Sequence, residues 1–227
     1  MPTDEVRGEI HVPDLDVAVS TARSTPRGAI ATLVLAHGAG AGMDHPFLAG
    51  FCRAIAEARV ATVRFNFPYV ERGRRAPDRE PALRATWTAV VDAVGTEAPA
   101  RPVLVGGKSL GGRIASMCVA EGMAADALVF LGYPLHPPGK PDRLRAEHLE
   151  RIRVPMLFVE GTRDPFAQPD RLDVVLALLG ALATLERVEG GDHSFRVPGP
   201  KVDDAVIGAT LASVVAPFVR RVAGRGA

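Results

Sequence analysis

The segment Val103–Arg113, with the sequence VLVGGKSLGGR, constrains the fold more than any other part of the chain. An apolar, β-branched run stands directly before Ser109, and residues with helical spacing follow it. Gly107 and Gly111 lie two residues on either side of the serine, in the pattern G-x-S-x-G. Small residues at these positions let a strand and the following helix cross closely. The segment therefore predicts a sharp strand-to-helix turn with the serine at its tip.

The same segment contains Gly-Lys-Ser, which also ends phosphate-binding loops. Such a loop needs a glycine five positions before the one in this tripeptide, but Pro102 stands there and has no N–H to offer a phosphate. A dinucleotide-binding fingerprint fails too. Counted from Gly38, its third glycine would be Met43. Counted from Gly40, it would be His45. Only the serine turn agrees with the residues around it.

Short runs that are almost continuously apolar and rich in β-branched residues recur along the chain. Such runs are typical of strands buried on both faces of a parallel sheet. They cover Ala31–Ala36, Val60–Phe67, Pro102–Val105, Ala127–Leu131 and Pro155–Val159, and a further strand-like segment covers Ala183–Val188. Segments with helical spacing lie between them, at Phe47–Arg59, Ala82–Val94 and Ile114–Glu121. The alternation predicts an α/β fold with an open, twisted, mostly parallel sheet and helices on both faces.

The two ends of the chain extend this pattern. Gly8–Val12 and Val17–Ala22 flank a Pro-Asp turn and predict an antiparallel pair at the edge of the sheet. Val202–Ala223 is apolar at helical spacing and predicts a long final helix. With 227 residues, no internal repeat and no convincing linker, we expect one domain spanning residues 1–227.

Composition and charge narrow the expected partners and compartment. A formal net charge of +1 gives no electrostatic reason to expect nucleic acid or an anionic membrane as partner. The N-terminus lacks the residue order of a secretory signal, and no apolar run approaches the ~20 residues of a membrane span. Cys52 and Cys118 fall in predicted helices, where free thiols are usually buried. We therefore expect a cytoplasmic protein and leave its oligomeric state open.

A serine on this kind of turn needs a base, because its hydroxyl is a poor nucleophile at neutral pH. In the usual chain order an acid follows the serine and a histidine follows the acid. His136, His148 and His193 lie downstream of Ser109. His193 comes directly after a strand-like segment and before the last helix, so it is the expected base. His148 stands among charges in a predicted helix, Arg143–Arg151, and is expected to be solvated, whereas His136 follows a strand end.

The expected acid is Asp164, in the turn directly after the strand Pro155–Val159. A carboxylate there can accept a hydrogen bond from His193 Nδ1–H and stabilise the imidazolium that forms when serine loses its proton. Asp192 is the alternative acid. It is adjacent to His193 in the sequence, and its carboxylate would struggle to reach the ring.

An anion cradle is expected beside the nucleophile. One donor is the backbone N–H of Leu110, at the start of the helix that follows Ser109. The second should come from the loop after the strand Ala31–Ala36, where small residues let the backbone approach a substrate oxygen. We expect this donor to be the N–H of Ala39.

Taken together, these residues resemble the α/β-hydrolase superfamily over essentially the whole chain, and the small, capless size looks like its dienelactone-hydrolase-like branch. Four segments are similar to a bacterial family of α/β-hydrolase-like proteins that also includes a eukaryotic subunit of a histone acetyltransferase (NSL) complex. They are His37–Gly40, Phe65–Tyr69, Gly107–Arg113 and Gly132–Lys140. The resemblance implies the fold more strongly than the activity. Dienelactone hydrolases themselves use cysteine where this chain has Ser109.

The interval between the strands Ala127–Leu131 and Pro155–Val159, where many relatives insert a lid, holds only a proline-rich loop and one short predicted helix. We therefore expect a shallow, open site suited to small or exposed esters. Candidate wall residues, each near a predicted strand end, are Met43, His45, Phe67, Tyr69, Tyr133, His136 and Phe166. Lys108 is expected to point outward, where it would attract acidic substrates if it has any role.

The sequence thus predicts a serine hydrolase that cleaves a carboxylic ester or thioester, with no metal or organic cofactor implied. Ser109 would attack, His193 would move the proton, and Asp164 would orient His193. Two alternatives stay open: a non-catalytic interaction module that keeps the fold, and an acyltransferase or perhydrolase that uses the same residues.

Overall fold

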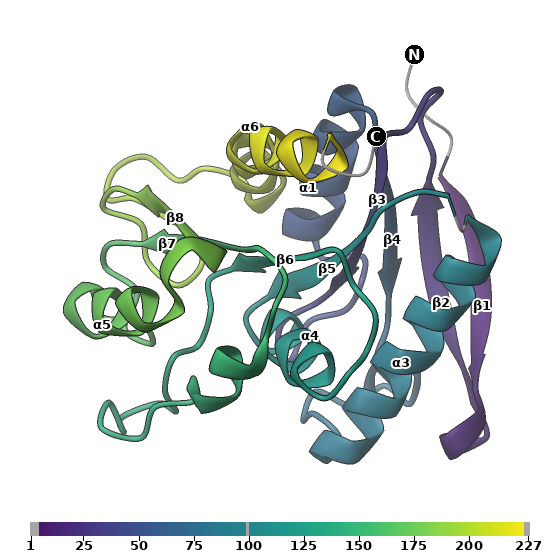
Figure 1. Ribbon diagram of the computed structural model, residues 1–227, viewed down its shortest axis with the longest axis horizontal. Helices are drawn as coiled ribbons and strands as arrows, with labels where there is room; N and C mark the ends of the chain where they lie inside the picture. Colours follow the sequence, from purple (N-terminus) through teal and green to yellow (C-terminus); the bar gives the residue numbers. More distant parts are fainter. Residues whose placement is uncertain (1–4, 99, 225–227) are drawn as a thin grey trace.

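The computed structural model describes residues 5–98 and 100–224 (Figure 1). Within them, eight strands form one sheet in the order β1-β2-β4-β3-β5-β6-β7-β8. The strands are β1 Val6–Val12, β2 Val17–Ser24, β3 Ala31–Ala36, β4 Val60–Phe65, β5 Val103–Lys108, β6 Ala127–Leu131, β7 Met156–Gly161 and β8 Ala183–Val188. Strands β3 to β8 run parallel, and the hairpin β1–β2 joins the edge antiparallel to β4. The predicted sheet and the predicted edge hairpin are confirmed.

Every predicted strand is present, but only β3, β6 and β8 have the predicted bounds, and two of the differences are informative. Every residue of β3, β4, β6 and β7 is buried, as expected for strands covered on both faces. Strand β4 ends at Phe65 rather than Phe67, because the chain turns there toward Pro68, the first residue of the next helix. Strand β5 extends through its glycines to Lys108, so it reaches the residue before Ser109.

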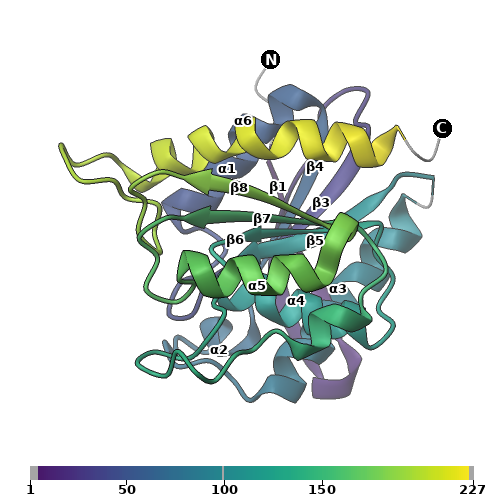
Figure 2. The same ribbon diagram turned by 60° about the vertical axis from the view of Figure 1, so that its left-hand side comes forward.

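Helices cover both faces of the sheet, as predicted (Figures 1 and 2). They are α1 Pro46–Ile55, α2 Pro68–Glu71, α3 Glu80–Glu97, α4 Leu110–Ala120, α5 Pro169–Leu179 and α6 Asp204–Ala223. One hydrophobic cluster joins α3, α4 and α5 to one face through residues such as Trp87 and Ile114. The other joins α1 and α6 to the opposite face through residues such as Phe51 and Val215. The result is a three-layer arrangement with the sheet in the middle.

The final helix, α6, is more apolar than the sequence analysis expected. It has 20 residues and a mean hydropathy of 1.5, which is long and apolar enough by composition to cross a membrane. Polar residues such as Thr210 and Ser213 interrupt the apolar run without lowering this mean much. Half of the helix is buried inside the protein. Its apolar face therefore serves the packing against α1 and the sheet.

The interval between β6 and β7 has no cap domain within the described part of the chain. The predicted helix Arg143–Arg151 is only a short 3₁₀ turn, Glu147–Arg151. The prediction that His148 is solvated is wrong: the side chain is half-buried, and its Nε2 lies 2.7 Å from Ser116 Oγ on α4. Burial, reinforced by the nearby charge of Arg113, lowers the pKa of His148 to about 4. The 3₁₀ turn of this interval therefore packs against α4.

The two cysteines are free and buried, as predicted. Burial raises the pKa of the Cys52 thiol to about 11 and that of the Cys118 thiol to about 12. Both thiols are therefore protonated and poorly reactive in the folded protein at neutral pH.

Helices α1 and α6 touch at the backbone. A Cβ at Gly208 would stand 2.0 Å from the carbonyl oxygen of Phe47, and a Cβ at Gly50 would stand 2.1 Å from that of Ala205. These distances are impossible for a side chain, so the two glycines set the spacing of the helices. Phe47, at the start of α1, stacks on the ring of Phe195, with the two ring centroids 5.8 Å apart.

We predict that Gly208→Ala lowers the free energy of unfolding by about 1–3 kcal/mol or more, because the added methyl group forces the helices apart. The matched control is Gly95→Ala on α3, where a Cβ would meet no atom within 4 Å. This change should leave stability unchanged or raise it by up to about 1 kcal/mol, because alanine favours helix. Urea unfolding of both variants makes the comparison. Equal effects at the two positions would contradict the backbone contact.

Candidate active site

Three side chains predicted from separate parts of the chain meet at the carboxyl edge of the parallel strands. Ser109 follows β5, Asp164 lies in the loop after β7, and His193 lies in the loop after β8. Nε2 of His193 lies 2.9 Å from Oγ of Ser109, and Nδ1 of His193 lies 2.6 Å from Oδ2 of Asp164. The structure therefore brings serine, histidine and aspartate into one hydrogen-bonded line.

The turn at Ser109 depends on the two glycines of the motif. Ser109 itself has φ 49° and ψ −112°, a conformation that a non-glycine residue rarely adopts. A Cβ at Gly107 would stand 2.1 Å from the carbonyl oxygen of Ala36, and one at Gly111 would stand 2.3 Å from the same atom. The predicted close crossing of strand and helix is thus confirmed. The backbone that both glycines approach is that of Ala36, the last residue of β3.

The tautomer of His193 follows from its two partners. The carboxylate of Asp164 accepts a hydrogen bond, so Nδ1 carries the proton and Nε2 is free to accept one from the hydroxyl of Ser109. Asp164 is buried, and its second oxygen accepts a hydrogen bond from the backbone N–H of Phe166 at 2.7 Å. The ring of Phe166 packs edge-on against the imidazole, with centroids 4.5 Å apart. The imidazole of His193 is therefore held by its neighbours on several sides.

Asp192, the alternative acid, has another task. Its Oδ1 accepts hydrogen bonds from the backbone N–H groups of Ser194 and Arg196, at 2.8 and 2.9 Å. This closes the loop that carries His193. The loop turns sharply at Phe195, which has φ 63°, and the side chain of Phe195 is buried. Asp192 shapes the loop and Asp164 contacts the imidazole ring.

The loop 37–45 lies beside the serine. A Cβ at Gly38 would stand 3.7 Å from Cβ of Ser109, and Ala39 lines the pocket above it. Leu110 is the first residue of α4, where a backbone N–H has no partner within its own helix. The two predicted donors, Ala39 and Leu110, therefore belong to the two segments that flank Ser109.

Strand β4 and the residues after it hold this loop by its main chain. The N–H of Met43 donates to Oδ1 of Asn66 at 2.8 Å, and the carbonyl of Met43 accepts from Nε of Arg64 at 2.9 Å. Met43 is consequently buried, and it does not line the pocket as the sequence analysis expected.

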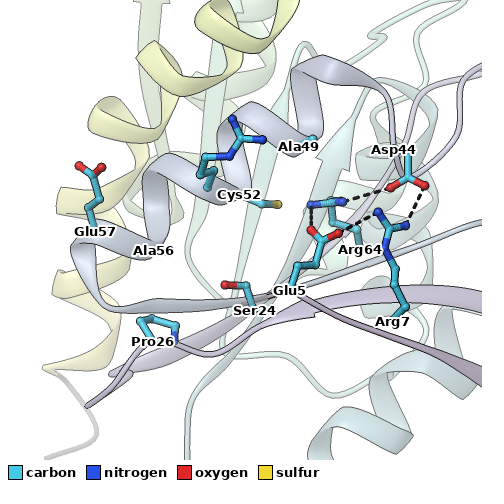
Figure 3. Close-up of a pocket in the computed structure, with 11 residues that line it drawn as sticks. Glu5, Arg7, Ser24, Pro26, Asp44, Ala49, Cys52, Ala56, Glu57 and Arg64 are labelled. Carbon is cyan, nitrogen blue, oxygen red and sulfur yellow. Dashed lines mark hydrogen bonds and ion pairs between the residues drawn. The ribbon is translucent and has the colours of Figure 1, made fainter. Parts of the chain in front are cut away.

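A charged cluster extends this clamp on the outer side of the loop (Figure 3). Buried Arg64 pairs with Glu5 at 2.8 Å and with Asp44 at 3.2 Å, while Arg7 pairs with the same two carboxylates at 2.8 Å. Hydrogen bonding to Arg7 lowers the pKa of the Asp44 carboxyl. The cluster lines a cavity of about 800 Å³ away from Ser109. Because these charges neutralise one another, the cluster fixes Asp44 and offers no unpaired charge to a ligand.

His37, directly after β3, was not predicted as a site residue from the sequence but lines the pocket. Its Nε2 accepts a hydrogen bond from the backbone N–H of Phe67 at 3.3 Å, and its Nδ1–H donates to the carbonyl of Gly38 at 2.9 Å. Burial lowers the pKa of His37 to about 4, so the ring is neutral at pH 7. Phe67 and Tyr69 pack against this ring, and they support His37 from beneath instead of forming pocket walls.

The pocket above Ser109 has a volume of about 460 Å³. Of the predicted wall residues, only His45 and Phe166 line it. Tyr133 is buried and donates its hydroxyl to the carbonyl of Arg145 at 2.8 Å. His136 is buried, with Nε2 2.8 Å from Oε1 of Gln168. Nearness to a strand end did not decide the direction of these side chains, because the chain turns inward after β6.

Two helices and the loop that carries His193 supply further pocket walls that were not predicted from the sequence. Phe47 and Leu48 from α1 form an apolar side. Arg196 and Asp204 form a charged rim, with an ion pair of 2.7 Å between them. His45 joins this rim, 3.8 Å from Asp204. No local motif marks these residues, because the packing of α1 on α6 brings them together.

Lys108 corrects another expectation, since it points inward. Its Nζ donates to the backbone carbonyl of His193 at 2.6 Å. Side chains alternate along a strand, and this position on β5 faces the side covered by α1 and α6.

Among the residues that the structure describes, no group of three histidine, cysteine, aspartate or glutamate side chains is arranged to hold a metal ion.

Solved structures of known proteins share this architecture. A dienelactone hydrolase from Anabaena variabilis is 19% identical to this chain and superposes on it with a TM-score of 0.76. The superposition covers 97% of this chain and 99% of the dienelactone hydrolase. An α/β serine hydrolase without a lid from Xanthomonas campestris is 20% identical, with 97% and 96% of the two chains covered and a TM-score of 0.75. An esterase domain from Rhodothermus marinus is 13% identical, with 96% and 98% covered and a TM-score of 0.74. At these identities the likeness concerns the fold.

Residues 29–220 match the family described as Alpha/beta hydrolase domain. The matched region begins just before β3 and ends within α6, so it contains the parallel strands, the serine turn and the loops of Asp164 and His193. The chain therefore belongs to the alpha/beta hydrolase domain family.

Proposed function

We propose that the protein is a serine hydrolase that cleaves a small carboxylic ester or thioester through an acyl-enzyme on Ser109. The observation that carries the proposal is the line of hydrogen bonds from Asp164 through His193 to Ser109, which opens on a pocket of about 460 Å³. Buried aspartate, oriented imidazole and strained serine are the three parts that make a hydroxyl reactive in water.

In the first half of the reaction, Oγ of Ser109 attacks the carbonyl carbon while its proton passes to Nε2 of His193. The carboxylate of Asp164 stabilises the imidazolium through Nδ1–H. The backbone N–H groups of Leu110 and Ala39 donate to the oxyanion, and one such donor is typically worth about 3 kcal/mol of the barrier. The intermediate then collapses, and the leaving alcohol or thiol takes the proton from Nε2. Ser109 remains acylated.

Water completes the reaction by the same steps in reverse. Nε2 of His193 takes a proton from water, the resulting hydroxide attacks the acyl carbon, and Oγ of Ser109 leaves with the proton from Nε2. The balance is one ester or thioester and one water in, one carboxylic acid and one alcohol or thiol out.

The pocket favours a small substrate. Phe47, Leu48 and Phe166 give it apolar walls, while Arg196 and Asp204 keep its rim polar. The short interval between β6 and β7 leaves it open, which suits exposed esters better than long acyl chains that need a closed tunnel. We place the reaction in the cytoplasm, with support from the two free buried thiols.

Within the family, we place the chain near the bacterial proteins related to the histone acetyltransferase (NSL) complex subunit. The support is the four segments whose sequences resemble that family. Two of these segments, His37–Gly40 and Phe65–Tyr69, are in contact in this structure, where the N–H of Phe67 donates to Nε2 of His37. A purely non-catalytic module is disfavoured by the aim of His193 at Ser109. An acyltransferase or perhydrolase would use the same residues with an alcohol or peroxide in place of water, so competition between these acceptors decides between them.

We predict that Ser109→Ala lowers kcat for a short-chain nitrophenyl ester by about 10⁴-fold or more, because no other hydroxyl of the described residues is hydrogen-bonded to His193. Ser213→Ala, on the exposed side of α6, is the matched control and should keep wild-type activity. Steady-state rates with esters of graded chain length test both variants. Equal rates for Ser109→Ala and wild type would refute the nucleophile.

We predict that Asp164→Asn lowers kcat by about 10⁴-fold while the protein stays folded, because an amide no longer favours the Nδ1–H form of His193. Asp192→Asn is the matched control. It keeps an oxygen for the N–H groups of Ser194 and Arg196, so its activity should stay within about tenfold of wild type. The same ester assay, with circular dichroism to verify folding, decides. The reverse order of the two losses would make Asp192 the acid.

A further inference from the structure

Lys108 is a charged side chain beside the site that the proposed mechanism does not use. On β5, Leu104 packs into the hydrophobic cluster of α1 and α6, and strand alternation carries Lys108 to the same side. The side chain is partly buried, borders the pocket, and donates its Nζ to the carbonyl oxygen of His193 at 2.6 Å. The short distance is that of a charge-assisted hydrogen bond.

The path of this side chain is lined on three sides by the segments that build the site. A Cβ at Gly38, in the loop after β3, would stand 3.6 Å from Cγ of Lys108. Gly132, after β6, has φ 73°, and a Cβ there would stand 2.9 Å from Nζ. The ring of Phe195 lies 5.4 Å from Nζ, in the segment 189–203 between β8 and α6 that carries His193 and is called the histidine loop below. The lysine therefore links three loops that are far apart in the sequence.

Three acidic groups act on the charge of Lys108, while His193, His45, Arg196 and Asp204 border the same pocket. Glu160 stands at the end of β7, Asp164 follows in the next loop, and Asp192 lies in the histidine loop. Glu160 is buried: one oxygen accepts from the N–H of Tyr133, and the other has no hydrogen-bond partner among the described residues. Burial raises the pKa of Glu160 well above its usual range. A raised pKa favours the neutral form of Glu160, which attracts an ammonium less than a carboxylate does. The hydrogen-bond acceptor of Nζ is the carbonyl oxygen of His193.

We propose that Lys108 is a positioning residue of the hydrolase: its ammonium grips the main-chain carbonyl of His193 and so holds the imidazole against Ser109. This inference rests on the proposed function. The link is direct, because the carbonyl and the imidazole belong to the same residue. A movement of about 1 Å at the carbonyl changes the distance of 2.9 Å between Nε2 and Oγ, and errors of that size cost up to about 100-fold in rate.

The strength of the hydrogen bond from Lys108 to the carbonyl of His193 depends on the protonation of Nζ. Burial lowers the pKa of Lys108 to about 8, against the opposing effect of Asp164, Glu160 and Asp192. A group with a lowered pKa loses its positive charge earlier as pH rises. The charged hydrogen bond to His193 therefore weakens above about pH 8, and kcat of the wild type should fall on the alkaline side.

The first test is Lys108→Met, which keeps an unbranched side chain of nearly the same length and removes its charged end. We expect kcat for a short-chain nitrophenyl ester at pH 7 to fall between about 10- and 100-fold, with KM within about twofold. We also expect the alkaline fall of the wild type, measured from about pH 6 to about pH 10, to be absent from the variant. Unchanged kcat, or an alkaline fall that persists without Lys108, would overturn the inference.

A second test separates positioning from a general loss of folding. In Lys108→Cys, the new thiol borders the open pocket, whereas Cys52 and Cys118 are buried with raised pKa values. The thiolate displaces bromide from 2-bromoethylamine, which restores an ammonium at nearly the original length. With 2-bromoethanol it gives a neutral arm of the same size. Intact mass spectrometry verifies one modification in each.

We expect the aminoethyl protein to exceed the hydroxyethyl protein in kcat by about tenfold or more, because both derive from one variant and differ only in the charged donor. Equal kcat in the two would overturn the positioning role. The proposed function is tested separately: a Ser109→Ala enzyme as active as wild type removes the hydrolase mechanism itself. If Ser109 is required but charge at position 108 has no effect, this inference alone fails.

Discussion

The close crossing of β5 and α4 over β3 is the constraint on which the rest of the site depends. Gly107 and Gly111 both approach the carbonyl oxygen of Ala36 so closely that neither position has room for a Cβ. This contact forces Ser109 into its unusual backbone conformation and lifts its hydroxyl above the edge of the sheet. Because parallel strands end at the same edge, the loops after β7 and β8 can then deliver Asp164 and His193 to that hydroxyl.

The segments around the serine are held by packing that also stabilises the fold. Arg64 and Asn66 hold the loop 37–45 from the side of β4, through the main chain of Met43. On the other side, the stacking of Phe47 on Phe195 ties the histidine loop to α1, whose spacing from α6 is set by backbone contact. Each of these two loops is thus held by a different layer of the fold, and this packing fixes the positions of the side chains at the site.

Sequence reasoning succeeded where a rule concerns the backbone. Apolar runs predicted β3, β6 and β8 to the residue, and chain order combined with strand ends selected the three side chains that meet. It failed where the direction of a side chain decides the outcome. Lys108 turns inward because of strand alternation, and Tyr133 is buried because the chain after β6 folds over α4. The rim of Arg196 and Asp204 forms between the loop that carries His193 and the first residue of α6, and no sequence motif marks it.

The most direct test of the central claim is covalent trapping. The folded protein is incubated with a fluorophosphonate, which phosphonylates a serine only when a base activates it. Peptide mass spectrometry then locates the adduct. We expect one adduct per chain, on Ser109, and none after denaturation. Failure of the folded protein to react, while a known serine hydrolase reacts under the same conditions, or an adduct on another residue, would contradict the claim that His193 and Asp164 activate Ser109.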